Sequence, residues 1–96
     1  MRFEWDKTKS KANERKHGVG FDEATTVFYD DDALLFDDPD HSDNEDRFLL
    51  FGLSSKARAL VVVHCERQDG GVIRIISARE ATARERAVYG GKGDNP

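Results

Sequence analysis

Four side chains in the second half of the chain are of the types needed to cut RNA: His64, Arg67, Arg79 and Glu85. RNA cleavage without a metal requires a base for the 2′-hydroxyl, cations for the charged transition state and an acid for the leaving 5′-oxygen. His64 or Glu85 can move the protons, while Arg67, Arg79 and Lys16 can hold the phosphate. Residue types alone leave this as one hypothesis among several, because a histidine in an apolar strand is often a packed core residue, and Glu85 can pair with an arginine of its own helix.

Other kinds of chemistry lack their sequence signatures. The possible soft metal ligands, His17, His41, His64 and Cys65, are not spaced as in metal sites. The sequence contains no phosphate-binding loop, no dinucleotide-binding G-x-G-x-x-G and no G-x-S-x-G nucleophile motif. We therefore expect no metal and no other cofactor, and we interpret Cys65, which lies in an apolar run, as a packed side chain.

The charge of the chain is unevenly distributed. The net charge is −4, but nine of the 19 acidic residues lie between Asp30 and Asp46, where there is no Lys or Arg, so the rest of the chain carries +5. A basic remainder is compatible with a nucleic-acid substrate. The acidic segment is open to three interpretations: a solvated loop, a cover over the basic surface, or a docking site for a basic partner.

The length of 96 residues suits one domain. We predict this domain over residues 1–90, followed by a flexible tail over residues 91–96. No apolar stretch approaches the roughly 20 residues of a membrane span, and the N-terminus lacks the apolar core of a signal peptide. The expectation is a cytoplasmic protein without membrane contact.

The first third of the chain predicts a strand and two helices. Arg2–Trp5 alternates polar and apolar residues, which is typical of a strand. Asp6 is a favourable N-cap for a helix from Lys7 to His17, ended by Gly18. This helix has almost no apolar residues, so we expect it on the surface displaying charge. A second, short helix is predicted from Phe21, because apolar residues follow it at helical spacing.

The rest of the chain predicts strands and a final helix. A strand over Ala33–Phe36 precedes three apolar runs, Arg47–Leu53, Ala59–Arg67 and Val72–Ser77, whose short connections favour antiparallel hairpins. Arg67 and Arg79 are then about a strand length apart, with His64 between them. Ser77 and Glu80 fit a capping box that predicts a helix over Ala81–Tyr89. The predicted order is β-α-α-β-β-β-β-α, an α+β layer with both sheet faces covered.

Four separated motifs resemble those of the BrnT family of toxins. The N-terminal motif comprises Glu4-Trp5-Asp6, Lys9, Asn13, Lys16-His17-Gly18-Val19 and Phe21. Further matches follow in order: Glu45-x-Arg47 with Gly52, Val62-Val63-His64-x-x-Arg67, and Ile73-Arg74-Ile75-Ile76-Ser77-Ala78-Arg79-x-Ala81-Thr82-x-x-Glu85-Arg86-x-x-Tyr89. The sequence departs from the family at Lys7, where Pro is common, and in its heavy acidic block.

The resemblance implies a small RelE-like fold, with an antiparallel sheet of four or more strands packed with two N-terminal helices and a C-terminal helix. It implies a metal-independent endoribonuclease that inhibits translation and is neutralised by a BrnA-like antitoxin with a ribbon-helix-helix part. Operator DNA would be bound only through the antitoxin, and the ribosome stays open as a partner. Among the matched positions we predict catalysis by Arg67, Arg79, His64 and Glu85. Substrate binding is predicted for Lys16, His17, Arg47, Arg86 and Tyr89.

Two alternatives belong to other functional classes. In the first, the chain is a non-catalytic binding module that docks a basic partner through the acidic 30–46 segment, and its arginines are structural. In the second, the chain binds DNA directly, for which the basic helix over Lys7–His17 is the only support.

Overall fold

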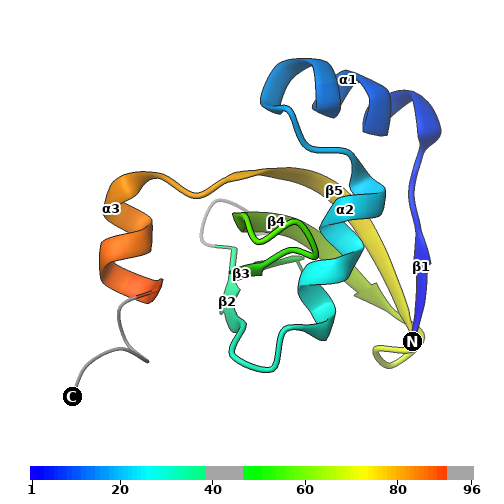
Figure 1. Ribbon diagram of the computed structural model, residues 1–96. Helices are drawn as coiled ribbons and strands as arrows, with labels where there is room; N and C mark the ends of the chain where they lie inside the picture. Colours follow the sequence, from blue (N-terminus) through cyan, green and yellow to red (C-terminus); the bar gives the residue numbers. More distant parts are fainter. Residues whose placement is uncertain (39–46, 91–96) are drawn as a thin grey trace.

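The computed structural model describes residues 1–38 and 47–90 and shows an α+β fold around one five-stranded sheet (Figure 1). The strands are β1 (Arg2–Glu4), β2 (Leu34–Asp37), β3 (Arg47–Leu53), β4 (Ala59–Arg67) and β5 (Val72–Glu80). Their order in the sheet is β1-β5-β4-β3-β2. The predicted tail over residues 91–96 and residues 39–46 of the acidic 30–46 segment lie outside the described residues.

The sheet is mixed, which corrects the prediction of a purely antiparallel sheet. Strands β2 to β5 pair antiparallel with one another, as their short connections predict. β1 instead pairs parallel with β5, with Phe3 opposite Ile73. Nothing local sets the direction of β1, because its partner lies about 70 residues later and no hairpin joins the two.

The two N-terminal helices begin where the sequence predicts. Helix α1 (Lys7–His17) starts at Asp6, whose side chain accepts a hydrogen bond from the N–H of Lys9 at 3.0 Å, and ends at Gly18, which adopts the left-handed conformation. Helix α2 (Phe21–Thr26) continues as a 3₁₀ turn over Val27–Tyr29. Both predicted helices are confirmed.

The end of β5 differs from the prediction. β5 continues to Glu80, which pairs with Leu60, so Ser77 and Glu80 are strand residues and form no capping box. The capping box lies one step later, at Thr82 and Glu85, and starts helix α3 (Ala83–Glu85). A π-helical turn over Arg86–Gly90 follows, where the sequence predicts a continuous helix. The correction has a physical reason: pairing with β4 satisfies the backbone through Glu80 before any helix can begin.

One face of the sheet carries the main hydrophobic core. Alternate strand residues point to this face and pack against α1, α2 and the segment between them (Figure 1). Gly52 lies under the 3₁₀ turn, where an added Cβ would come within 3.0 Å of Val27 and closer still to Ala33. The buried members of this core are Val19, Phe21, Ala24, Val27, Leu50, Leu60, Val62, Ile73, Ile75 and Ala78.

Asn13 docks α1 on the edge of β5. Its amide nitrogen donates to the carbonyls of Val19 and Ala78, each at 2.7 Å, and its oxygen accepts from the N–H of Ala78 at 3.2 Å. β1 pairs with β5 only as far as Arg74. The Asn13 amide therefore takes the place of a neighbouring strand and satisfies both backbone groups of Ala78. The sequence predicts the exposed basic side chains of α1 but not this buried polar contact.

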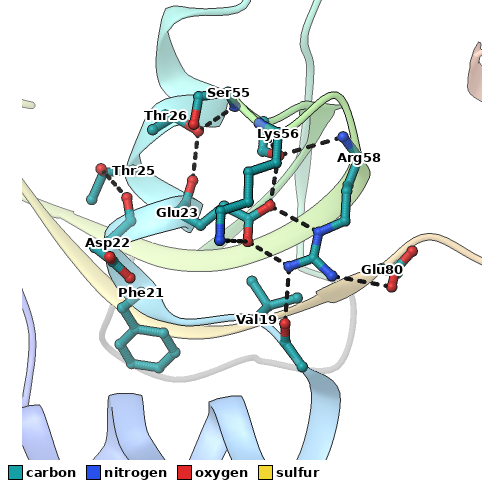
Figure 2. Close-up of polar contacts among 12 residues, drawn as sticks. Val19, Phe21, Asp22, Glu23, Thr25, Thr26, Ser55, Lys56, Arg58 and Glu80 are labelled. Carbon is teal, nitrogen blue, oxygen red and sulfur yellow. Dashed lines mark hydrogen bonds and ion pairs between the residues drawn. The ribbon is translucent and has the colours of Figure 1, made fainter.

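A buried ion pair fixes α2 against the turn between β3 and β4. Glu23 is 6% exposed and accepts hydrogen bonds from Ser54 and from two nitrogens of Arg58. Figure 2 shows the Arg58 guanidinium between Glu23 and Glu80, to which it also bonds at 3.3 Å. The Arg58 hydrogen bonds lower the pKa of Glu23 although burial opposes this shift. Because every part of the buried charge is paired, the cluster stabilises the junction of α2 with the sheet.

We predict that Asn13→Ala destabilises the fold by about 3 kcal/mol, because three buried backbone groups lose their partner while helix propensity improves only slightly. Urea unfolding of the whole chain measures this change. Lys9→Ala is the matched control, since Lys9 is exposed on the same helix, and should change stability by less than about 0.5 kcal/mol. Equal stability of the two variants would contradict the docking role of Asn13.

Candidate active site

The second face of the sheet carries a smaller core at one end only. Phe51, Val61 and Ala81 are buried there, and Phe36, Leu49, Ala59 and Tyr89 pack against them. Tyr89 comes from the turn after α3, and its ring lies 4.9 Å from the ring of Phe36 and 5.6 Å from that of Phe51. The prediction that both faces are covered holds fully for the α1–α2 face; on this face the α3 segment covers one end (Figure 1).

Three arginines of two strands, β3 and β5, point to this second face. Arg79 is opposite Val61, Arg47 is opposite Cys65, and Cys65 is also opposite Arg74. Residues opposite one another share a face, and side chains alternate along each strand. The Nε atom of Arg47 is buried and has no hydrogen-bond partner among the residues that the structure describes.

Arg79 and Glu85 form a two-pronged ion pair at the rim of this face. The two terminal nitrogens of Arg79 donate to the two carboxylate oxygens of Glu85 at 2.8 and 2.9 Å. Glu85 is held by its place in the capping box, where its Oε1 accepts from the N–H of Thr82. Hydrogen bonding from Arg79 lowers the pKa of Glu85 to about 2, against the opposing effect of burial, and raises that of Arg79. Both groups are charged at neutral pH.

A hollow of about 220 Å³ opens beside this ion pair. Its apolar lining comes from Phe36, Leu49, Phe51, Val61 and Tyr89, and Asp37 and Glu85 complete the lining. The sequence nominates Glu85 and Tyr89 but gives no signal for Asp37, which looks like part of a solvated acidic segment. Only the pairing of β2 with β3 brings Asp37 to the edge of this hollow, and its place opposite Phe48 directs its side chain towards the other face.

The predicted catalytic residues are not all brought together. Arg67 is opposite Val72, at the other end of the β4–β5 pair from Arg79. It is half exposed and lies 3.8 Å from Glu4, which also bonds Arg74 at 3.0 Å. Arg67 therefore stands apart from the Arg79–Glu85 pair, as the predicted strand-length separation implies.

His64 is fully buried between the rings of Phe28 and Phe48, with centroids at 4.8 and 5.7 Å. It points to the face covered by α1 and α2, away from Arg79, because it follows Val62 and Leu60 in the strand alternation. Burial lowers the pKa of His64 to about 4, and a weak contact with the Val62 backbone opposes this only in part. His64 is thus a neutral core side chain at neutral pH and does not reach the second face.

The predicted substrate-binding residues divide between two regions. Arg86 and Tyr89 lie in the turn after α3, where Arg86 is exposed and bonds the carbonyl of Ala81 at 3.0 Å. Lys16 and His17 are exposed in the last turn of α1, on the helix-covered side of the sheet. The structure therefore gathers Arg79, Glu85, Arg86 and Tyr89 and leaves the α1 pair elsewhere.

Comparison with models of protein families identifies the family of this chain. The family model described as the ribonuclease toxin BrnT of a type II toxin–antitoxin system matches residues 5–85. The chain belongs to the BrnT family. No curated protein matches the chain in a sequence search. The BrnT match extends from Trp5 in the N-terminal motif, through Asn13 and Arg79, to Glu85 of the ion pair.

Two further findings concern metal ligands and membrane-spanning helices in this BrnT chain. Among residues 1–38 and 47–90, no three side chains of His, Cys, Asp or Glu are gathered as metal ligands. Within the same described part, no helix is long and apolar enough to cross a membrane.

The burial of His64 predicts a pH dependence of stability. The folded state holds the pKa of His64 at about 4, below the usual value of 6.5. The unfolded chain therefore takes up the proton first, and stability falls as the pH falls from 6.5 towards 4. We expect a loss of about 2 kcal/mol between pH 7.5 and 5. Urea unfolding at several pH values measures it, and His64→Leu should remove most of the slope. A wild-type stability that is flat over this range would contradict the burial of a neutral imidazole.

Proposed function

We propose that the chain is a RelE-like endoribonuclease toxin that cleaves RNA without a metal and thereby inhibits translation, and that a BrnA-like antitoxin neutralises it in the cytoplasm. The family, described as ribonuclease toxins of type II systems, supports the class of activity. The observation that carries the proposed site is the Arg79–Glu85 pair, which holds a cation and a carboxylate together at the rim of a hollow on an arginine-bearing sheet face.

Arg79 is the proposed phosphate-binding residue. Its guanidinium already holds the two oxygens of the Glu85 carboxylate, and the two non-bridging oxygens of a phosphodiester can accept the same pair of hydrogen bonds. The pair is only partly buried, since the side chains of Arg79 and Glu85 are 40% and 26% exposed. An incoming phosphate can therefore displace Glu85 without leaving a buried charge unpaired.

Displacement changes what Glu85 can do. Its pKa is low chiefly because Arg79 bonds it, so transfer of Arg79 to a phosphate raises that pKa and makes the carboxylate a stronger base. Glu85 then accepts the proton of the 2′-hydroxyl, whose oxygen attacks the adjacent phosphorus. The bond from phosphorus to the 5′-oxygen breaks, and a proton donor completes the 5′-hydroxyl. Arg79 stabilises the negative charge that builds up on the phosphate oxygens.

Arg67, Arg47 and Arg86 are proposed to bind the RNA backbone on either side of the cleaved phosphate, since backbone phosphates are the usual ligands of such arginines. Lys16 and His17 would then contact more distant RNA around the edge of the sheet. We assign no proton transfer to His64.

The direct test is RNA cleavage in EDTA by the wild type and by Arg79→Ala. We expect the wild type to cleave and Arg79→Ala to lose about 100-fold or more in rate, because the transition state loses its cation. Arg79→Lys keeps the positive charge but loses the paired N–H groups of the guanidinium, so its cleavage rate should lie between those of the wild type and Arg79→Ala. Arg15→Ala is the matched control: Arg15 is exposed on α1, and the rate should change little.

Three results would contradict the proposal in different ways. Equal rates for the wild type and Arg79→Ala, with both proteins folded by circular dichroism, would reject the site. Cleavage that EDTA abolishes and Mg²⁺ restores would reject metal independence. No cleavage of free or ribosome-bound RNA would reject the activity.

A further inference from the structure

The second face of the sheet carries another arginine–glutamate pair, at the opposite end of β5 from Arg79. Arg74 in β5 is opposite Glu4 in β1, and Nη1 of Arg74 donates to the Glu4 carboxylate at 3.0 Å. The side chains of Arg74 and Glu4 are 33% and 36% exposed. This pair is therefore about as open to solvent as the Arg79–Glu85 pair, whose side chains are 40% and 26% exposed.

Arg74 can bind a further anion while it keeps its bond to Glu4. A guanidinium carries five N–H donors on three nitrogens. Within residues 1–38 and 47–90, Arg74 uses only Nη1, for the bond to Glu4. Its Nε and Nη2 donors are therefore available to two oxygens of a phosphate. Arg79, in contrast, uses both of its terminal nitrogens to bind Glu85.

We propose that Arg74 is a second phosphate-binding residue, and that a single strand of RNA runs along β5 from Arg79 to Arg74. The inference rests on the proposed function and adds the course of the RNA across the same face. β5 leads from the edge beside β1 to α3 (Figure 1). Between the two arginines, Ser77 and its partner Val63 lie on the second face and are partly exposed. The path along β5 is therefore open to a ligand.

The spacing of the two arginines fits a strand of several nucleotides. Arg79 is opposite Val61, and Arg74 is opposite Cys65, four residues further along β4. Four strand residues span about 13 Å. Stacked nucleotides rise about 3.4 Å each, so the phosphates bound by the two arginines are about four nucleotides apart in a stacked strand. A dinucleotide, which has one phosphate, cannot bind both arginines.

A nucleic-acid strand suits the two arginines better than an acidic segment of a partner protein. A strand carries a phosphate at every nucleotide, so RNA whose cleaved phosphate lies on Arg79 also brings further phosphates along β5. Carboxylates of a protein could bind Arg74 without any link to Arg79. Coupling of the two arginines through one ligand is therefore the property that the experiment must detect.

The test uses a dinucleotide and a hexanucleotide of 2′-deoxythymidine, which lack the 2′-hydroxyl, so binding to the full chain is measured without cleavage. Nuclear magnetic resonance follows the side-chain N–H groups of Arg74 and Arg79 during each titration. We expect the hexanucleotide to shift both resonances with the same dissociation constant, because one strand binds both arginines. For the variants of Arg74 and Glu4, the dissociation constant is read from the Arg79 resonance.

Arg74→Ala should weaken hexanucleotide binding at Arg79 about tenfold, as expected when a hydrogen bond to a charged group is lost. The slope of log affinity against log salt concentration should become shallower by about 0.7, the value for one phosphate of a single strand. Dinucleotide binding at Arg79 should change by less than about twofold, because Arg74 is more than a screening length away.

Glu4→Gln tests the inference in the opposite direction and does not depend on the folding of Arg74→Ala. It removes a negative charge that competes for Arg74, so hexanucleotide binding should become about threefold tighter. Lys11→Ala is the control for a lost positive charge: Lys11 is exposed on α1, and hexanucleotide binding should change by less than about twofold. The amide spectrum shows whether each variant is folded.

Three results would overturn this inference. The first is hexanucleotide binding at Arg79 that neither Arg74→Ala nor Glu4→Gln changes, as expected if Arg74 binds carboxylates of a partner protein. The second is an equal loss for dinucleotide and hexanucleotide in Arg74→Ala, as expected if Arg74 only supports the fold. The third is the absence of any shift at Arg79. Failure of the proposed function looks different: both variants change hexanucleotide binding as stated, but RNA is not cleaved.

Discussion

The structure depends on one polar contact at the edge of the sheet, where the side chain of Asn13 replaces a missing strand beside Ala78. β1 is too short to cover β5 to its end, and an exposed or unpaired backbone there would weaken the last third of the strand. The amide of Asn13 fixes Ala78 on the helical face. Arg79 follows in the strand and, by alternation, points to the opposite face. The contact of Asn13 with Ala78 on one face of the sheet therefore positions the Arg79 guanidinium on the other face.

Two arginine–glutamate pairs with similar bonds have different burial and therefore different roles. Glu23 is 6% exposed and bonds both Arg58 and Ser54, so removal of Arg58 would leave a carboxylate in the interior with Ser54 as its remaining hydrogen-bond partner. The Arg79–Glu85 pair is partly open to solvent, where an ion pair contributes little to stability. The first pair holds α2 to the sheet. The second can exchange its carboxylate for a phosphate at small cost, which is what a substrate-binding cation requires.

Local signals in the sequence predict much of the fold. Asp6 and Gly18 define α1, and the apolar runs give β3 and β4 with their observed bounds, because caps and hydrophobic runs act over a few residues. The end of β5 is predicted wrongly because Ser77–Glu80 and Thr82–Glu85 both fit a capping box, and the choice depends on pairing with Leu60 in another strand. The parallel β1 and the burial of Asn13 are equally non-local.

The candidate site is predictable to the same extent. Arg79 and Glu85 belong to one sequence motif and are only six residues apart. The short segment between β5 and α3 is therefore enough to bring their side chains together. Asp37 comes to the edge of the hollow only through the pairing of β2 with β3. Burial decides the case of His64: its residue type suits proton transfer, but its surroundings of Phe28 and Phe48 keep it neutral and out of reach. Residue type indicates which side chains could be catalytic, whereas the face of the strand on which each lies determines whether it can contact a substrate.

The central claim is that a 2′-hydroxyl attacks the phosphate held by Arg79 without help from a metal. Mass spectrometry of the products formed in EDTA tests it most directly, with one RNA and a copy that carries a single 2′-deoxynucleotide at the main cleavage site. The account predicts 2′,3′-cyclic phosphate and 5′-hydroxyl ends, and no cleavage at the deoxy position. Ends with a 3′-hydroxyl and a 5′-phosphate, or cleavage that persists at the deoxy position, would contradict it.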